Sequence, residues 1–434
     1  MNQQEFHQRR ERLMRAMPPG SVAILPAAAE VVRNRDVHYP YRQDSDFQYL
    51  TGFPEPEAVL VLAPEREAGA YVLFCRKKDP EREIWDGYRA GQQGAVEAYG
   101  ADQAFPIEEI DAVLPGILEG RSRVYATMGV NPAFDQRLLA WVNGLRRRAR
   151  SGVRTPRDFV ALEHDLHEMR LFKSAAEIEA MRRSAEIAVG AHIRAMQACR
   201  PGLHEYELEA EFLHHFRAHG CPPSYPAIVG VGANACVLHY IDNAARLRDG
   251  DLLLIDAGAE YAYYASDVTR TFPVNGRFQP AQKALYEVVL AAQAAAIEQV
   301  RPGCCWNDPH QAAVRMLTEG MVALGLLAGA VDELIEQGAY KRFYMHHTGH
   351  WLGMDVHDVG DYKTGDAWRA LEPGMTLTVE PGLYIPPHSE GVPREFQGIG
   401  IRIEDDVLVT ASGPEVLTEA CPKSVADIEA LMAA

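Results

Sequence analysis

The chain has 434 residues, of which 47% are apolar and 24% are charged, and it carries a formal net charge of -17. This composition excludes intrinsic disorder, and the length exceeds what one core normally supports, so two or three domains are expected. The acidic charge and the scattered Lys and Arg residues argue against nucleic acid or an anionic membrane as a partner, because both repel an acidic surface.

The cysteines and the N-terminal segment predict where the protein resides. The seven cysteines show neither CxxC spacing nor the density of a disulfide scaffold, which predicts reduced thiols. The first 17 residues are polar and helical in character rather than a signal peptide, and no apolar run approaches about 18 residues. Asn-Xaa-Ser/Thr acceptors are missing as well. Together these features predict a cytoplasmic protein.

Residues 1–172 are predicted to form an α/β domain. An opening amphipathic helix is followed by apolar runs such as 58–62 and 71–75, which are typical of buried strands. After residue 172 the pattern changes to a long helix, in which Ser174 and Glu177 form a capping-box pattern. The domain boundary is therefore expected here, with a second domain over 173–434.

The second domain contains a weak internal repeat. Two long helical segments end at Arg-Pro-Gly sequences, 200–202 and 301–303, and another helical stretch follows each of them. Strands that carry two acidic residues come next in both cases. The pattern indicates two duplicated α+β halves that face each other. The alternative is that the two Arg-Pro-Gly sequences recur by coincidence, because the repeat is so short.

Acidic residues occupy strand-like segments of this domain. Asp256 ends an apolar strand and Asp267 is expected in the next one, with a turn near 261–262, so that the two acids oppose each other directly. Opposed positions lie about 5 Å apart, where like charges are unfavourable unless a cation separates them. Glu404 follows Arg402 by two residues, which predicts a shared strand face and a guanidinium that orients a nearby carboxylate. A single acid in a strand usually faces solvent instead.

Five donor side chains share this apolar, strand-like setting: Asp256, Asp267, His350, Glu380 and Glu404. A buried carboxylate is unfavourable unless it is paired, hydrogen-bonded or bound to a cation, and four together repel one another. We therefore expect two divalent metal ions. An oxygen-rich set with one imidazole favours Mn²⁺, with Co²⁺, Zn²⁺ or Fe²⁺ as possible substitutes.

Histidines are concentrated in residues 345–359. This segment contains four of them: His346, His347, His350 and His357. Glycines near His350 and His357 allow close backbone approach and favour a functional role. For His347 the alternative is an ordinary histidine of the core. A fifth candidate, His239, follows a Gly-rich stretch.

Several strings in the chain resemble a known family. The segments IDAGAEY, SDVTRTF, HTGHWLGMDVHDVG, TVEPGLY and GIGIRIEDD are similar to those of the pita-bread metallopeptidases. YPYRQDSDFQYLTGF, the EIW stretch around Trp85 and HEMRLFKS resemble the N-terminal domain and linker of the aminopeptidase P members. The resemblance covers nearly the whole chain. It implies an α+β protein with a C-terminal pita-bread fold of pseudo-twofold duplicated halves and a smaller N-terminal α/β domain.

The resemblance also implies roles for individual residues. Asp256 and Asp267 would bind one metal, with Asp267 bridging, while His350 and Glu380 would bind the other and Glu404 would bridge both. The remaining matches are the substrate-binding histidines His239 and His357, the catalytic-set histidine His346, and the cleft residues Tyr225, Tyr384 and Arg402. This chain departs from the family at His347, where the family usually has glycine, and the local pocket shape is expected to differ there.

The activity implied by the resemblance is hydrolysis of the N-terminal Xaa-Pro bond, which releases the first residue from peptides with proline second. Two metals would lower the pKa of a bridging water and hold hydroxide as the nucleophile. Glu380 would transfer the proton, while His357 and His239 would steady the carbonyl oxygen. Trp85 and Tyr384 are candidates for an apolar slot around the proline ring, with ordinary packing as the alternative for Trp85.

Four other functions are alternatives to this one. An Xaa-Pro dipeptidase would use the same ligands but accept only dipeptides, and creatine-type amidinohydrolases share the architecture without the metal set. A catalytically silent binding module would have lost the ligands. A two-metal phosphodiesterase would need a basic cleft or a phosphate-binding loop, and the GVGAN segment at Gly230 lacks the full spacing.

The resemblance implies a homo-oligomer, a tetramer or a dimer. In such an assembly the N-terminal domains would pack near neighbouring active sites, with Asp36 and Trp85 acting across the interface.

Overall fold

A computed structural model describes residues 1–433 and divides the chain into two compact units. The first unit comprises residues 1–169 and the second begins at residue 170. This division falls within helix α7 (Leu162–Leu171), three residues before the boundary expected from the sequence. Within the described residues no helix has both the length and the apolar character needed to cross a membrane.

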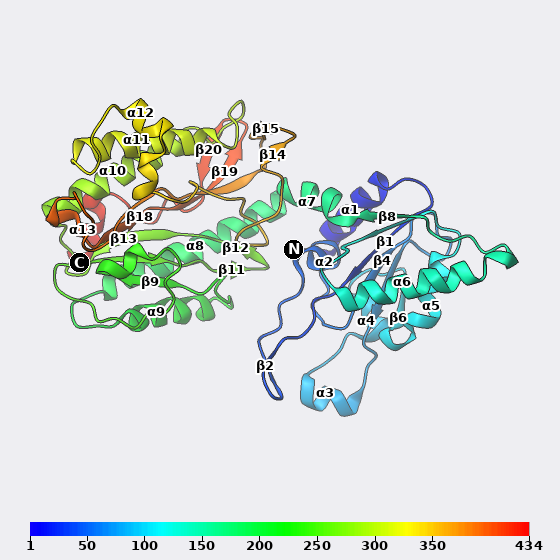
Figure 1. The fold of residues 1–434 in the computed structure, drawn as a ribbon. Helices are drawn as coiled ribbons and strands as arrows, with labels where there is room; N and C mark the ends of the chain where they lie inside the picture. The colour runs from blue at the N-terminus through cyan, green and yellow to red at the C-terminus, as the bar shows by residue number, and fades with distance from the viewer. Residues whose placement is uncertain (434) are drawn as a thin grey trace. The chain divides into compact units, whose positions relative to one another are not determined.

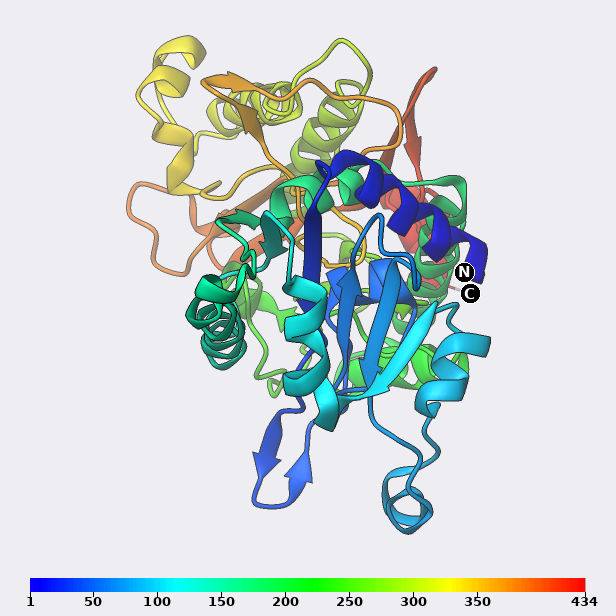
Figure 2. The ribbon, with the colours of Figure 1, turned by 90° about the vertical axis from the view of Figure 1, so that its right-hand side faces the viewer.

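The first unit is built on a six-stranded mixed sheet with strand order β6-β5-β4-β1-β7-β8 (Figure 2). Its strands are β1 (Ser21–Pro26), β4 (Val59–Leu62), β5 (Tyr71–Cys75), β6 (Gln103–Pro106), β7 (Arg123–Ala126) and β8 (Asp158–Ala161), with a separate hairpin of β2 (Val32–Asn34) and β3 (Val37–His38). Its helices before α7 are α1 (Gln3–Ala16), α2 (Ser45–Thr51), α3 (Pro80–Asp86), α4 (Gly91–Glu97), α5 (Ile110–Leu118) and α6 (Pro132–Arg147).

The predicted apolar runs form central strands of this sheet. Residues 58–62 and 71–75 correspond to β4 and β5, and every residue of these two strands is buried. They pair antiparallel, with Val61 opposite Val72. Burial on both faces explains why their sequences are continuously apolar rather than alternating.

The second unit contains helix pairs on two sides of short sheets (Figure 1). Its helices are α8 (Ala175–Ala198), α9 (Glu205–Ala218), α10 (Pro280–Ile297), α11 (Asp308–Ala323), α12 (Val331–Glu336) and α13 (Val425–Ala433). Its strands are β9 (Ile228–Val231), β10 (Leu252–Asp256), β11 (Glu260–Tyr261), β12 (Tyr264–Ala265), β13 (Thr269–Pro273), β14 (Lys363–Thr364), β15 (Ala367–Trp368), β16 (Thr376–Val379), β17 (Gly382–Ile385), β18 (Ile399–Arg402), β19 (Asp405–Thr410) and β20 (Gly413–Val416).

The two halves of this unit repeat the same order of elements. In the first half, helices α8 and α9 precede the antiparallel sheet β13-β10-β9. In the second, α10 and α11 precede the antiparallel sheet β16-β19-β20. This is the duplicated α+β architecture expected from the sequence.

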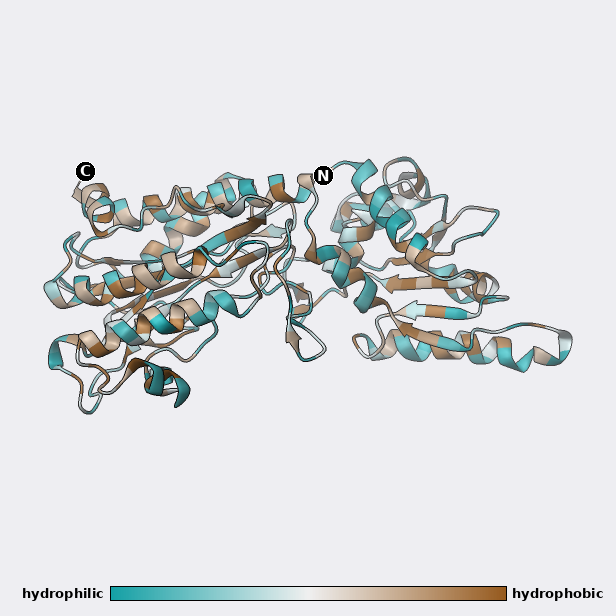
Figure 3. Cartoon of the chain, turned by 90° about the horizontal axis from the view of Figure 1, so that it is seen from above, coloured by the Kyte–Doolittle hydropathy of each residue, from teal (hydrophilic) through white to brown (hydrophobic). Residues whose placement is uncertain are grey.

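Helix α8 begins where the sequence predicts. Ser174 Oγ accepts the N–H of Glu177, and the Glu177 carboxylate accepts the N–H of Ser174, which completes the capping box. The helix ends before Pro201, and Gly202 takes a positive φ of 99°. Hydrophobic residues lie mainly on the strands and on the inward sides of helices (Figure 3).

One continuous core joins both halves of the second unit. Phe212 of α9, Phe272 of β13, Tyr286 of α10 and Ile401 of β18 belong to the same buried cluster. Because the core spans the two helix pairs, the strands between them are held rigidly.

All seven cysteines of the chain are free thiols, as predicted.

The strand pairing around Asp256 differs from the predicted hairpin. Strand β10 pairs with β13 so that Asp256 lies opposite Thr269, and Asp267 lies two residues before β13 begins. The short strands β11 and β12 continue this pairing to a turn at Ala262 and Tyr263, both with positive φ. The prediction that the two acids directly oppose each other is therefore wrong, because the turn lies one residue later than the expected 261–262 and the register shifts with it.

Candidate metal centre

A cavity of about 360 Å³ lies within the second unit. Its walls are formed by Leu238, His239, Asp256, Asp267, His346, His347, Gly349, His350, His357, Tyr362, Glu380, Arg402 and Glu404. All five predicted metal-binding residues are among them. We refer to this cavity as the donor cavity.

Backbone pairing brings His350 beside Glu380. The chain around His350 runs along β16, where the Thr378 N–H donates to the His350 carbonyl (3.0 Å) and the Glu380 N–H to the Thr348 carbonyl (2.8 Å). A Cβ at Gly349 would lie 2.0 Å from the Thr378 carbonyl oxygen, so only glycine allows this approach. The His350 Nε2 and Glu380 Oε1 atoms end 3.8 Å apart.

Asp267 and Glu404 come from different halves and meet through Thr269. The Glu404 N–H donates to the Thr269 carbonyl (3.1 Å), and the Thr269 hydroxyl donates to the Glu404 carboxylate (2.6 Å). The Asp267 N–H donates to the Asp406 carboxylate at 3.2 Å. These bonds fix the backbone of one half against the other at the donor cavity.

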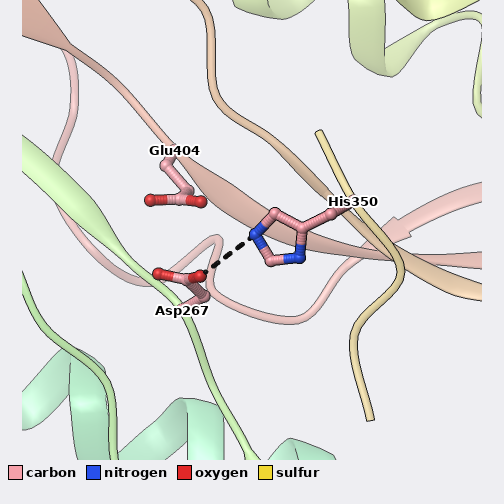
Figure 4. A group of neighbouring side chains, drawn as sticks. All are labelled: Asp267, His350 and Glu404. Carbon is pink, nitrogen blue, oxygen red and sulfur yellow. Dashed lines mark ion pairs between the residues drawn. The ribbon is translucent and has the colours of Figure 1, made fainter. Parts of the chain in front are cut away.

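Three of the donors form a compact cluster (Figure 4). Donor atoms of Asp267, His350 and Glu404 all lie within 4.8 Å of one another, and His350 Nε2 is 3.4 Å from Asp267 Oδ2. The Glu404 and Asp267 carboxylates both lie beside the imidazole in the figure. The cluster has the donor types that bind divalent cations.

Asp256 is oriented by two neighbours rather than by the cluster itself. Arg402 Nη2 donates to Asp256 Oδ2 at 2.5 Å, and the Tyr225 hydroxyl lies 2.6 Å from Asp256 Oδ1 and 2.5 Å from Asp267 Oδ1. Arg402 also donates to the hydroxyl of Tyr384 (2.9 Å). The predicted cleft residues Tyr225, Tyr384 and Arg402 therefore contact the site through polar atoms.

The predicted relation between Arg402 and Glu404 is partly wrong. Arg402 ends β18, whereas Glu404 lies between β18 and β19, so the two do not share a strand face. The guanidinium does orient a carboxylate, that of Asp256. Its Nε also donates to Thr269 Oγ1 (3.1 Å), the hydroxyl that contacts Glu404.

Buried charge shifts the pKa values of the donors. Burial raises the pKa of Glu380 to about 7, and burial with the charges of Asp267 and Glu380 raises the pKa of Glu404 well above its usual range. Burial opposes protonation of His350, but Asp267 and Glu380 outweigh it and raise its pKa to about 9. The protein's own cations thus leave an excess of buried acid, which protons or metal ions must compensate.

The predicted substrate histidines lie on the walls of the donor cavity. His346 Nε2 lies 2.9 Å from the Tyr384 hydroxyl, and its Nδ1 lies 3.8 Å from Glu380. The His357 ring packs edge-on against His350 with centroids 4.2 Å apart. Burial, followed by the charge of Arg402, lowers the pKa of His346 to about 4, so this ring is neutral at neutral pH.

A buried ion cluster anchors the loop that carries His357. The next residue, Asp358, accepts from Arg170 (2.6 Å) and from Lys173 (3.0 Å), and its N–H donates to the Trp351 carbonyl (2.9 Å). The Arg170, Lys173 and Asp358 side chains are almost fully buried. Removing one member would leave the others uncompensated, so the loop position is fixed.

Trp85, unlike the other predicted site residues, belongs to the first unit. It belongs to α3 of the first unit, where its side chain is 83% exposed, and it is not among the lining residues of the donor cavity. Sequence reasoning missed Thr269, Tyr362 and Asp406 at the site. Asp406 directly follows two acids in IEDD, which was the available signal, whereas nothing local marks Thr269.

Clustered carboxylates and an imidazole between two α+β halves define a metal-dependent hydrolase. Two family models match the chain: metallopeptidase family M24 over residues 179–411, and the aminopeptidase P N-terminal domain over residues 6–125. The chain belongs to metallopeptidase family M24, in its aminopeptidase P group.

Individual relatives are similar over the full length. Xaa-Pro aminopeptidase of Escherichia coli is 49% identical, covering 100% of this chain and 98% of the relative. Xaa-Pro aminopeptidase of Haemophilus influenzae is 46% identical, covering 99% of this chain and 97% of the relative. The solved aminopeptidase PepP of Pseudomonas aeruginosa is 60% identical with a TM-score of 0.99, covering 100% and 98%. A zinc-substituted E. coli aminopeptidase P with product has a TM-score of 0.97 at 49% identity, covering the same shares.

Metal removal should lower the thermal stability of the protein. A divalent ion that binds only the folded cluster stabilises it by about 2.7 kcal/mol at 100 times its Kd. We expect EDTA to lower Tm by roughly 5–10 °C and a divalent ion to restore it, as measured by calorimetry.

Two variants test the origin of this shift. Glu404→Gln removes one buried donor charge and should at least halve the shift, whereas Glu415→Gln, at a surface pair with Arg182, should keep it. Equal Tm with and without the ion would contradict a metal centre.

Proposed function

We propose that this protein is an Xaa-Pro aminopeptidase that removes the first residue from peptides with proline second, with two Mn²⁺ ions as its cofactor. The observation that carries the proposal is the convergence of Asp267, His350 and Glu404 in one cavity with Asp256 and Glu380. Its hard, oxygen-rich donor set favours Mn²⁺ over ions that prefer thiolates. The named relatives support the substrate class.

The proposed ligands are Asp256, Asp267, His350, Glu380 and Glu404. When bound, the two ions supply an activated water and polarise the scissile carbonyl. The neutral form of His350 is the one that binds metal, so metal uptake at neutral pH would release the proton that its pKa of about 9 retains.

Glu380 is the proposed proton-transfer residue. Its carboxylate lies among the proposed ligands, 3.8 Å from His350 Nε2, and therefore beside the position that an activated water would take. His357 and His239 line the same cavity and are proposed to donate hydrogen bonds to the substrate carbonyl. His346 is proposed to act with them in the catalytic set.

The proline ring is proposed to lie beside His346 and Tyr384. The two rings are 5.5 Å apart, and Arg402 fixes the Tyr384 hydroxyl. Tyr384 is fully buried behind His346, and its hydroxyl lies 2.9 Å from His346 Nε2, so it holds the His346 ring in position. The free amine of the first residue would then lie by the ligands, which accounts for an exopeptidase.

We also propose a domain boundary between residues 172 and 173, with the catalytic residues confined to the C-terminal domain, 173–434.

We propose a cytoplasmic location, which the seven free thiols support.

Peptide cleavage tests the function directly. We expect the Mn²⁺-loaded protein to release arginine from Arg-Pro-Pro, and to cleave Arg-Ala-Ala about 100-fold more slowly, in an assay of free amino acids. EDTA should stop the reaction. Rapid cleavage of Ala-Pro with no attack on Arg-Pro-Pro would instead identify a dipeptidase.

Glu380→Ala should lower kcat for Arg-Pro-Pro by about 10²–10⁴-fold, because proton transfer is lost. His357→Ala should reduce kcat/KM strongly while metal content, measured by emission spectroscopy, stays unchanged. A near-normal kcat in Glu380→Ala would remove this residue from the mechanism, and metal loss in His357→Ala would make it a ligand.

We propose that the chain forms a homodimer or homotetramer through its first unit. Ile84 and Trp85 of α3 are 80% and 83% exposed, and Tyr88, which follows this helix, is 96% exposed. The β2–β3 hairpin exposes Val32 and Val37. Apolar groups so exposed favour burial by a second copy. Trp85 and Asp36, near these two segments, are proposed to act across that interface.

Sedimentation should give two or four times the chain mass of 48.1 kDa. Replacing Trp85 and Tyr88 by Asp should shift it to the monomer, whereas Val130→Asp, at another exposed apolar position, should not. A monomeric wild type at micromolar concentration would contradict the proposal.

A further inference from the structure

A second cavity of about 290 Å³ adjoins the donor cavity. It is lined by Trp306, His347, Gly349, Tyr362 and Trp368, and we refer to it as the aromatic side pocket. His347, Gly349 and Tyr362 line the donor cavity as well. The two cavities therefore have a common wall, and the aromatic side pocket lies next to the proposed ligands.

The base of this pocket is fixed by packing. Trp306 is 4% exposed, and its ring lies 4.1 Å from that of Trp351 and 4.5 Å from that of Tyr362. The backbone N–H of Trp306 donates to the Arg369 carbonyl (2.8 Å), and the backbone N–H of Arg369 donates to the Tyr362 carbonyl (3.0 Å). The pocket is therefore a preformed part of the fold rather than a gap between mobile side chains.

His347 forms a second flat wall. Its ring is nearly parallel to that of Trp306, at 10° with centroids 6.1 Å apart, and it stacks on His310 at 4.1 Å. His347 therefore adds a flat imidazole face to the pocket, beside the rings of Trp306, Tyr362 and Trp368. Aromatic faces of this kind suit a planar side chain that packs against them.

The lining of the pocket offers no carboxylate that could pair with a cationic side chain. None of its five lining residues carries a carboxylate, and Lys363 Nζ lies 4.3 Å from the centroid of the Trp368 ring. Burial lowers the pKa of His310, behind His347, to about 3, so that ring is neutral. A carboxylate side chain would lose its hydration without an ion-pair partner among the lining residues.

Gly349 places the pocket on the side of the first substrate residue. It directly precedes His350, and the first residue with its free amine lies by the ligands in the proposed function. The adjacent residues His346 and His347 separate the proposed position of the proline ring from the aromatic side pocket. His346 contacts Tyr384, whereas His347 contacts His310. The proline ring and the first side chain therefore have different walls.

We propose that the aromatic side pocket binds the side chain of the first peptide residue and makes the enzyme selective for phenylalanine, tyrosine or tryptophan there. This inference rests on the proposed function, because it specifies the substrate class of the same site.

The test compares kcat/KM for Phe-Pro-Ala with that for Ala-Pro-Ala. In the wild type we expect a ratio of about 10, as one well-packed ring in a pocket provides. Trp368→Ala should reduce the ratio about fivefold, and Trp368→Phe should retain most of it. Trp368 is 37% exposed on the β14–β15 hairpin, so its loss should not unfold the protein. Tyr206→Ala, at a half-exposed ring on α9, is the matched control and should keep the wild-type ratio.

The outcomes separate the two levels of inference. If no Xaa-Pro peptide is cleaved, the proposed function fails. If Ala-Pro-Ala is cleaved but the wild type shows no preference for Phe-Pro-Ala, or Trp368→Ala keeps that preference, only the pocket assignment is overturned. A preference for Ala-Pro-Phe over Ala-Pro-Ala that Trp368→Ala removes would assign the pocket to the third residue and overturn the proposal.

Discussion

Four carboxylates in one buried volume need more positive charge than the surrounding side chains supply. Arg402 neutralises Asp256, and His350 lies beside Asp267, but burial still raises the pKa of Glu380 and of Glu404. Folding must therefore hold together groups that repel one another. The energy for this comes from the apolar core and from backbone pairing, and bound cations remove the remaining repulsion.

The duplicated halves of the second unit provide this restraint. Strand β10 of the first half and β18 of the second both contribute to one core, so neither sheet can move away from the other. The fully buried pair of Arg270 and Asp405 reinforces the junction, and Asp405 also accepts from Lys423 and Gln293. Such a network is satisfied only in one arrangement, which favours a single geometry at the donor cavity.

The segment 345–359 connects the chemistry to the proposed selectivity. His346 and His350 line the donor cavity, and His347 lines both this cavity and the aromatic side pocket. The close approach of Gly349 to β16 fixes the backbone between His347 and His350. A change at His347 would alter the proposed side-chain pocket and leave the donor atoms untouched, because His347 is not one of the proposed ligands.

The sequence alone determined the features that depend on neighbouring residues. The capping box of α8, the buried strands β4 and β5, and the position of Asp256 at the end of an apolar strand follow from short-range pattern, because hydrogen bonding and burial act there over a few positions. The other four predicted donors lie in connecting segments beside strands, not within them as expected: Asp267, His350, Glu380 and Glu404. The tertiary structure decided what depends on distant segments. It placed Thr269 rather than Asp267 opposite Asp256, separated Glu404 from the strand of Arg402, and brought Trp306 to Tyr362 across more than fifty residues. Register and ring packing are set by contacts between elements, and no local pattern encodes them.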